Sequence, residues 1–434
     1  MNESVERATI RKLYLRLLPF LFILYFICYL DRINVGFAAL TMNTDLGFNA
    51  SIYALGASAF FWGYCIFEIP SNIVLEKIGA RIWIARIMIT WGLLAVGTAF
   101  VTGVTSFAIV RCLLGVAEAG FFPGIVLYFT YWFPGRYRGR VVGAFMTALP
   151  ISIALGSPIS TALLELDGFL GLAGWKWVFI GEGLPAVLLG ISVLFYLTDR
   201  PAKARWLTEE EREWLIAELA AERRAVDGVR VYTVLQAFAN LRTLALAVIW
   251  LGTATAALGL VLFLPQILKQ LGLSTMMIGF AAAIPYVAGS IGMVVWGYVS
   301  DRMHERRWNL FGGCFVAAVG LTVAGLLNGS LWALVGMSVA TVGIYGMKGP
   351  FWPLPSTYLS GMAAAASIAA INSIGNLGGL IGPLTVGWIK DRTGSFEAGL
   401  YVLAGWALLS AVVTLIAVRE PRRRVAPSFG LRAG

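Results

Sequence analysis

Ionisable side chains of both signs lie inside long apolar stretches of this chain, and their types suit the binding of protons and anions. Asp31 and Arg32 fall near the middle of one such stretch, and Arg111 and Glu118 lie seven residues apart in another. A spacing of seven is about two helical turns and puts both side chains on one face. A carboxyl group in such surroundings can take up and release a proton. An arginine can hold a carboxylate by charge-assisted hydrogen bonds.

Lys348 is a third cation within an apolar stretch, in YGMKGPFWPLPS, where prolines and glycines predict local unwinding. A second cation facing Arg32 from the other half of the chain would suit a substrate with two anionic or polar ends. A structural interpretation is open for each position. Asp31 and Arg32 can form an ion pair that locks a helix to its neighbours, and Glu118 can be a neutral, hydrogen-bonded acid. Lys348 can extend towards lipid headgroups.

The composition is that of a polytopic membrane protein. Apolar residues make up 59% of the 434, charged residues only 13%, and the mean hydropathy is +0.80. We expect no cleavable signal peptide, because the first 16 residues are polar and the first apolar run is too long for one. The four cysteines all lie in apolar runs, so we predict packing roles for them and no disulfide or metal site.

The apolar stretches are long enough to cross a membrane as helices. The first, 17–40, has 24 residues and would span about 36 Å, against a bilayer core of about 30 Å. An ionised side chain at that depth faces a bundle interior or a water-filled cavity. We predict an all-α fold with twelve spans at 17–40, 51–75, 82–103, 106–131, 140–164, 175–198, 243–268, 275–299, 308–328, 331–357, 364–389 and 398–418.

A polar stretch divides these spans six and six and predicts two bundles. The expected domains are 1–198, a cytoplasmic linker at 199–242, and 243–434 with a basic cytoplasmic tail. Within the linker, Thr208 to Arg224 is predicted to form an amphipathic helix on the membrane surface, begun by a capping box of Thr208 and Glu211.

The distribution of lysine and arginine predicts the orientation. Of the 33 residues, 26 lie in segments on the side of the N-terminus and 4 in loops on the opposite side. By the positive-inside rule both termini are cytoplasmic. The net charge of +10 therefore reflects membrane topology, and we predict no binding of nucleic acid.

Two loops at matched places in the halves carry acidic and basic residues side by side. They follow the second and eighth spans, PSNIVLEKIGARIW and GYVSDRMHERRW. Such symmetry is typical of a rocking transporter with a central site. We predict that these loops form a cytoplasmic gate, although simple positive-inside anchoring would explain them too. The residues assigned to this gate are Glu76, Lys77, Arg81, Asp301, Arg302 and Arg306.

Several stretches resemble the anion:cation symporter family of the major facilitator superfamily. They are YLDRINVGFA (29–38), EIPSNIVLEKIGARIWIARIMITWG (68–92), RCLLGVAEAGFFPGIVLYFTYWFP (111–134), GWKWVFIGEGLPA (174–186) and INSIGNLGGLIGPLTVGWIKDRTG (371–394). Within the family, the bacterial tartrate and hydroxyphenylacetate permeases are most similar. The resemblance implies the twelve-helix fold and protonation at Asp31 and Glu118. It also implies that Arg32 and Arg111 lie near the anion and the coupling network.

Polar and aromatic residues of other spans complete the predicted substrate site. Tyr64 lies near mid-depth, and the resemblance implies that it contacts substrate. Asn372 and Asn376 lie one turn apart and face one way, so they can bind ligand hydroxyls or join helices. Trp352 is a weaker candidate. Packing is an open alternative for Tyr64. GVAEAG and GNLGGLIG are interpreted as helix-packing glycines, since neither opens a strand–turn–helix phosphate site.

These observations predict a proton-coupled symporter that imports a small organic carboxylate, and not an enzyme. A tartrate-like hydroxy-dicarboxylate or an aromatic acid would fit. The expected partners are the substrate, protons and membrane lipid, with no cofactor and with a monomeric state, in the inner membrane of a bacterium. The alternatives are an antiporter that exports drugs or exchanges anions, and a sensor that binds ligand without moving it. A proton-gradient requirement for accumulation separates import from efflux.

Overall fold

The computed structural model describes residues 3–226, 236, 239–303, 305–355 and 361–418, and all regular structure within them is helical. The first half contains α1 (Glu3–Asp45), α2 (Ala50–Ile78), α3 (Ala80–Thr98), α4 (Val104–Glu118), α5 (Phe121–Trp132), α6 (Gly135–Met146), α7 (Ala148–Leu164) and α8 (Gly174–Tyr196), followed by α9 (Glu209–Val226). The second half contains α11 (Leu241–Lys269), α12 (Thr275–Met303), α13 (Arg307–Leu326), α14 (Ala333–Gly346), α15 (Lys348–Phe351), α17 (Gly361–Asn376), α18 (Gly378–Thr393) and α19 (Glu397–Ala417).

The predicted all-α membrane fold is confirmed. Ten helical stretches of the described chain are long and apolar enough to span a membrane, with α4–α5 and α6–α7 each forming one of them. The predicted spans 331–357 and 364–389 are not among the ten, because each is divided into pieces of at most 16 residues. The dividing residues, Met347 and Leu377, keep right-handed helical dihedral angles, so each pair of pieces follows nearly one path.

Three of these interruptions lie directly beside predicted site residues. Glu118 is the last residue of α4, Lys348 the first of α15, and Asn376 the last of α17. The packing role predicted for Gly120 is confirmed, because a Cβ there would be 2.4 Å from the Ser71 hydroxyl oxygen of α2. Gly120 also adopts a left-handed φ of 85°, next to Ala119, whose ψ of 132° ends α4 after Glu118. Helix ends inside a bundle can leave backbone groups available to a cavity or ligand.

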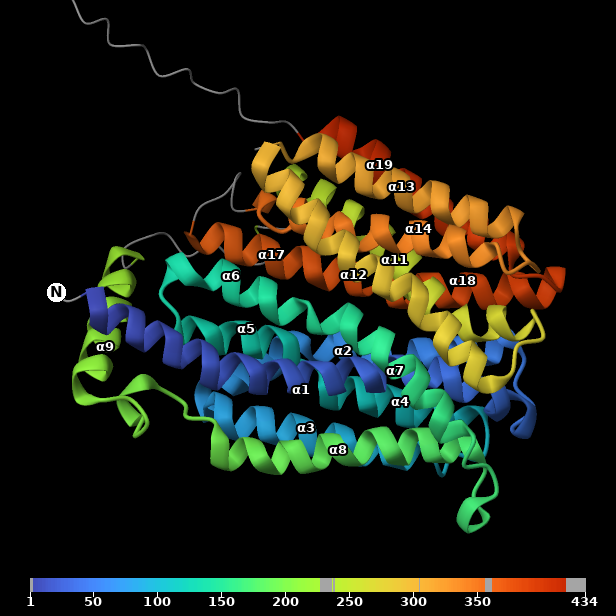
Figure 1. Cartoon of the computed structure of the whole chain (residues 1–434), viewed down its shortest axis with the longest axis horizontal. Coiled ribbons are helices and arrows are strands. Elements are labelled where there is room, and N and C mark those ends of the chain that lie inside the picture. The colour runs from blue at the N-terminus through green and yellow to red at the C-terminus, as the bar shows by residue number, and fades with distance from the viewer. Residues whose placement is uncertain (1–2, 227–235, 237–238, 304, 356–360, 419–434) are drawn as a thin grey trace, which may run out of the picture.

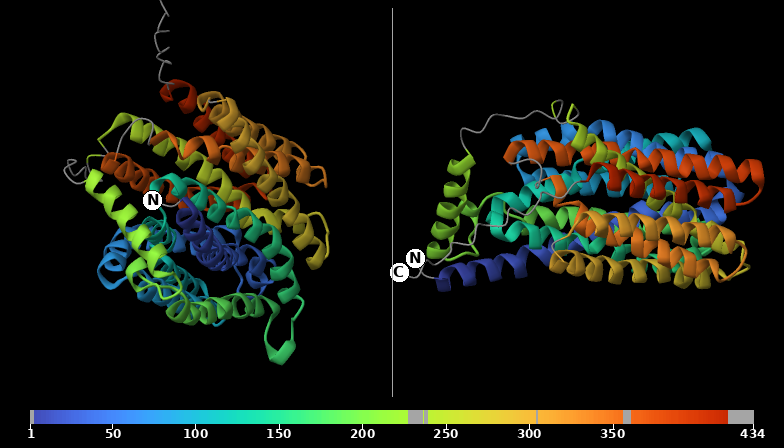
Figure 2. Two further views of the ribbon diagram at one scale, coloured as in Figure 1. Left: turned by 60° about the vertical axis from the view of Figure 1, so that its left-hand side comes forward. Right: turned by 90° about the horizontal axis from the view of Figure 1, so that it is seen from above.

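Helices α1–α8 pack with one another, and so do α11–α19 (Figures 1 and 2). The N-terminus and α9 lie at one end of the molecule, which we call the linker end, and the turns around residues 46–49, 165–173 and 270–274 lie at the other, the loop end. The arrangement agrees with two bundles, whose boundaries near residues 198 and 243 stay a prediction.

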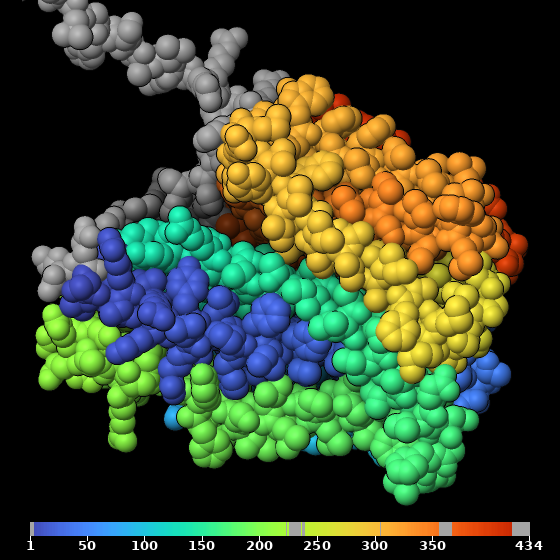
Figure 3. Space-filling model, viewed as in Figure 1, coloured from blue at the N-terminus to red at the C-terminus, as the bar shows by residue number. Residues whose placement is uncertain are grey.

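The two bundles meet closely at the loop end. The Tyr53 hydroxyl donates to the Leu262 carbonyl (2.9 Å), and Lys269 donates to the carbonyl of Leu40. The backbone N–H groups of Ala50 and Ser51 donate to the Asp391 carboxylate (3.0 and 2.8 Å). Towards the linker end, the surface is hollowed between α6 and the end of α12 (Figure 3). The structure is therefore closed at the loop end and more open at the linker end.

Candidate substrate and proton site

Arg32 and Glu118 form an ion pair between α1 and α4 inside the first bundle. Glu118 has no exposed surface, and the Cys28 thiol also donates to its Oε1 (3.2 Å). The Arg32 guanidinium lies over the rings of Tyr29 and Tyr64, about 5 Å from each centroid. α4 reaches this position because Gly115 lies against α2: a Cβ there would be 1.9 Å from the Phe60 carbonyl oxygen. The packing role predicted for Gly115 is confirmed.

Asp31 and Arg111 form a second buried acid–base arrangement beside the first. Both side chains are 1% exposed, and their charges interact. The Asn34 amide donates to Asp31 Oδ1 (2.9 Å). Among the described residues, Asp31 Oδ2 and Arg111 Nε have no hydrogen-bond partner. The site therefore contains two acids and two arginines on facing helices, with hydrogen-bonding capacity left for a proton or an anion.

A cavity of about 90 Å³ lies between the bundles beside these residues. Arg32 and Arg111 line it from the first bundle, and Lys348 and Asn376 from the second. The rest of the wall is mainly apolar and aromatic: Tyr29, Ile33, Phe61, Leu149, Ile153, Trp250, Thr253, Ala254, Ala257, Leu258, Val261, Leu262, Ile344 and Tyr345. A few convergent polar groups in an otherwise apolar wall are typical of a ligand site.

Lys348 lies in the cavity wall, which is a requirement of the prediction that it faces Arg32. Its Nζ lies 4.3 Å from the Tyr345 ring centroid and 5.8 Å from that of Trp250. These rings shield the ammonium from lipid and attract its charge. Tyr29 and Tyr345 each precede a cavity cation by three residues, on the same helical face. This three-residue spacing indicates that each tyrosine lies beside a cation, and the sequence analysis did not use it.

The other predicted substrate residues lie behind this wall. Tyr64 is 3% exposed and stacks on Phe60. Trp352 packs edge-on against Trp250, with ring centroids 4.9 Å apart. The Asn372 amide donates to Glu68 Oε1 (2.7 Å). Tyr64 and Trp352 therefore support the cations and rings that line the cavity, and their direct contact with substrate stays a prediction.

The fold and these charged groups agree with comparisons to known proteins. The model of the Major Facilitator Superfamily matches residues 21–383. This chain belongs to the major facilitator superfamily. A protein of Agrobacterium vitis named "Putative tartrate transporter" is 52% identical over 98% of this chain and 99% of its own length. The "Quinolone resistance transporter" of Acinetobacter baumannii is 41% identical over 96% and 97%. The structure of the xylose transporter XylE from E. coli has a TM-score of 0.76 at 14% identity and covers 94% of this chain and 99% of that one.

Members of the superfamily are multi-pass membrane transporters and not enzymes, and both statements hold for this chain.

At the linker end, the structure describes the residues assigned to a cytoplasmic gate. Glu76 and Lys77 are exposed at the end of α2, and Asp301 pairs loosely with Arg306 in its own bundle (3.7 Å). Arg81 uses its backbone N–H to bind Asp199 Oδ1 (2.9 Å). Arg302 is exposed at the end of α12. A clamp between the bundles by these residues stays a prediction for the state closed at this end.

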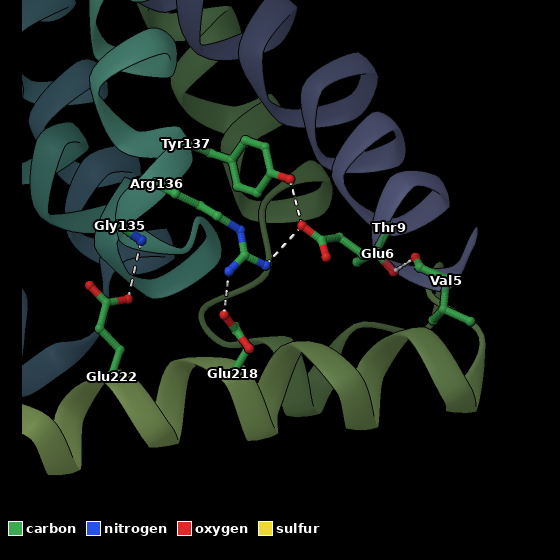
Figure 4. Close-up of polar contacts among 8 residues, drawn as sticks. All are labelled: Val5, Glu6, Thr9, Gly135, Arg136, Tyr137, Glu218 and Glu222. Carbon is green, nitrogen blue, oxygen red and sulfur yellow. Dashed lines mark hydrogen bonds and ion pairs between the residues drawn. The ribbon is translucent and has the colours of Figure 1, made fainter. Parts of the chain in front are cut away.

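The linker helix α9 packs across the end of the first bundle. Arg136 of α6 binds Glu218 of α9 (2.7 Å) and Glu6 of α1 (2.8 Å), and the Tyr137 hydroxyl also donates to Glu6 (2.6 Å; Figure 4). The predicted capping box is confirmed, with Glu211 N–H donating to the Thr208 hydroxyl (3.3 Å). Lipid contact by α9 stays a prediction.

Proposed function

We propose that this transporter is a proton-coupled symporter which imports a small organic dicarboxylate into the bacterial cytoplasm. The observation that supports this most directly is that Arg32 and Lys348 line one cavity from opposite bundles. A ligand with two carboxylates can bind one cation at each end and so bridge the two halves. The name "Putative tartrate transporter" of the Agrobacterium vitis relative agrees with such a ligand.

The acids give the proposed coupling its mechanism. In this structure Glu118 holds Arg32, and the charge of Asp31 acts on Arg111. Protonation of each acid would remove its attraction and leave the arginine free to bind a substrate carboxylate. Loss of the proton on the cytoplasmic side would restore the pairing and expel the anion. The bound proton and substrate thus favour each other.

The membrane potential sets a lower limit on the number of protons. A negative interior opposes anion entry by about 2.3 kcal/mol per charge per 100 mV. The potential therefore ceases to oppose accumulation of a dicarboxylate only when at least as many protons as anionic charges enter with it. We expect electroneutral or net positive uptake, and uptake of net negative charge would contradict the proposal.

Binding of two ligands tests the role of the two cations. Lys348→Met should weaken tartrate binding to the purified protein about 10- to 100-fold, the usual range for a lost hydrogen bond to a charged group. Binding of the monocarboxylate 4-hydroxyphenylacetate should change much less. Lys203→Met is the control, because Lys203 is exposed in the linker. Equal losses for both ligands would exclude a dicarboxylate that bridges Arg32 and Lys348.

Export is a second candidate, favoured by the 41% identity to the "Quinolone resistance transporter". The apolar and aromatic part of the cavity wall could hold the rings of a quinolone. A proton gradient that drives norfloxacin outwards, but drives no accumulation of an organic acid, would show that the protein is an exporter and not an importer.

A further inference from the structure

Glu68 joins the two bundles at a point that the proposed transport mechanism does not use. It lies on α2 with 5% of its surface exposed. Its Oε1 accepts a hydrogen bond from Asn372 Nδ2 (2.7 Å) and its Oε2 accepts one from Asn376 Nδ2 (3.3 Å), both on α17 of the other bundle. These partners are 304 and 308 residues away in sequence. One buried carboxylate thus occupies both amides that the sequence assigns to substrate.

The contact lies on the linker side of the cavity. Asn376 is in the cavity wall, and Asn372 is one turn nearer the start of α17, which lies at the linker end (Figure 1). The two hydrogen bonds hold the bundles together at this level, although the surface nearer the linker end is hollowed (Figure 3). Separation without a replacement partner would leave a buried carboxylate and two amides unsatisfied, which is unfavourable.

We propose that Glu68 acts as an internal carboxylate which replaces the substrate in the empty carrier. Without substrate, Glu68 binds Asn372 and Asn376 and closes the linker side of the cavity, as the empty carrier must do to return to the outward-facing state. A substrate carboxylate that reaches Asn376 displaces Glu68. This inference rests on the proposed import of a carboxylate, and it assigns Glu68 as a positioning residue rather than a substrate contact.

The proposal separates two kinds of transport. Net uptake requires the empty carrier to return, whereas exchange of labelled for unlabelled substrate proceeds with the carrier always loaded. Glu68→Leu should slow net uptake of labelled tartrate into tartrate-free proteoliposomes about tenfold, the lower range for a lost hydrogen bond to a charged group. Exchange into proteoliposomes loaded with unlabelled tartrate should stay within about twofold of the wild type. Equal slowing of both would overturn the proposal.

Matched variants exclude a general effect of removing a buried acid. Glu182→Gln is the control, because Glu182 is 1% exposed and receives its hydrogen bond from Ser160 in the same bundle (2.6 Å). It should change net uptake and exchange by the same factor. If Glu68 and Asn372 act as a pair, adding Asn372→Leu to Glu68→Leu should slow net uptake less than twofold further. If the slowing of net uptake in the double variant equals the product of the two single effects, the pairing is contradicted.

A readout without substrate separates this inference from the proposed function. In a cysteine-free background, spin labels at the exposed positions Ile78 and Met303 would report the distance between the linker ends of α2 and α12. Glu68→Leu should move the distance distribution of the empty protein to longer values, and an unchanged distribution overturns the proposal. A wild-type protein that neither accumulates nor exchanges any organic acid would refute the transport function, whatever this distance measurement gives.

Discussion

Replacement of Asp391 by alanine should shift the transporter away from the state that is closed at the loop end. Asp391 lies near the end of α18 and accepts hydrogen bonds from the N–H groups of Ala50 and Ser51, at the start of α2 in the other bundle. These N–H groups have no partner within α2, and the positive end of the helix dipole adds to the attraction.

The size of the effect follows from this geometry. Each of the two hydrogen bonds is exposed to solvent, so we assign about 0.5–1 kcal/mol to each and treat the dipole as part of that value. Together they favour the closed loop end by about 1–2 kcal/mol, a population change of about five- to thirtyfold. Asp391→Ala should therefore populate the state open at the loop end.

Pulsed electron paramagnetic resonance can measure this change. Spin labels at Leu170 and Trp332, both exposed at the loop end, report the distance between the bundles. Asn49→Ala is the control: Asn49 caps the same turn of α2 by accepting from Ile52 N–H (2.8 Å), but it does not cross between bundles. A longer-distance population only in Asp391→Ala is the expected result. Identical distributions for the wild type and Asp391→Ala, or equal changes in both variants, would refute the reasoning.

Other predictions concern stability and the linker. Gly115→Ala should destabilise the protein by about 1–3 kcal/mol, because its Cβ would overlap the Phe60 carbonyl, whereas Gly143→Ala, with open space around it, should leave the melting temperature nearly unchanged. Arg136→Ala should loosen α9 around Glu218, measured as faster amide exchange in that turn, while Arg138 still binds Glu222. Burial acts to raise the pKa of Glu211, but hydrogen bonds from Lys12 and Thr208 outweigh it and lower the pKa below its ordinary value of 4.5. The docking that Glu211 adds is thus present above that value and lost as the pH falls through the lowered pKa, which a spin label on α9 would detect as increased mobility.

Much of the fold is predictable because a bilayer permits few solutions. An apolar run such as 17–40 must satisfy its backbone internally, so it forms a helix. Local rules were equally reliable at the capping box of Thr208 and Glu211, which the structure reproduces. The helix ending at Glu118 was missed, since GVAEAG contains no proline, and the structure interrupts the helix at Ala119 and the left-handed Gly120.

The site was less predictable, because it depends on how two bundles meet. Because Arg32 and Lys348 lie well inside apolar stretches, the sequence indicates that they are buried, but not that both line one cavity. The contact of Glu68 with Asn372 depends on the relative tilt of the bundles, which no local pattern encodes. Trp250 carried no signal either, because aromatic residues are common in any membrane helix.

Proton-driven uptake measures the central claim most directly. Purified protein in proteoliposomes should accumulate labelled tartrate against its gradient when the outside is made acidic, with protons entering alongside it. Asp31→Asn should lose this gradient-driven accumulation and keep exchange, because the acid that faces Arg111 can no longer release a proton. Accumulation that is independent of the proton gradient, or that persists unchanged in Asp31→Asn, would contradict coupling through Asp31.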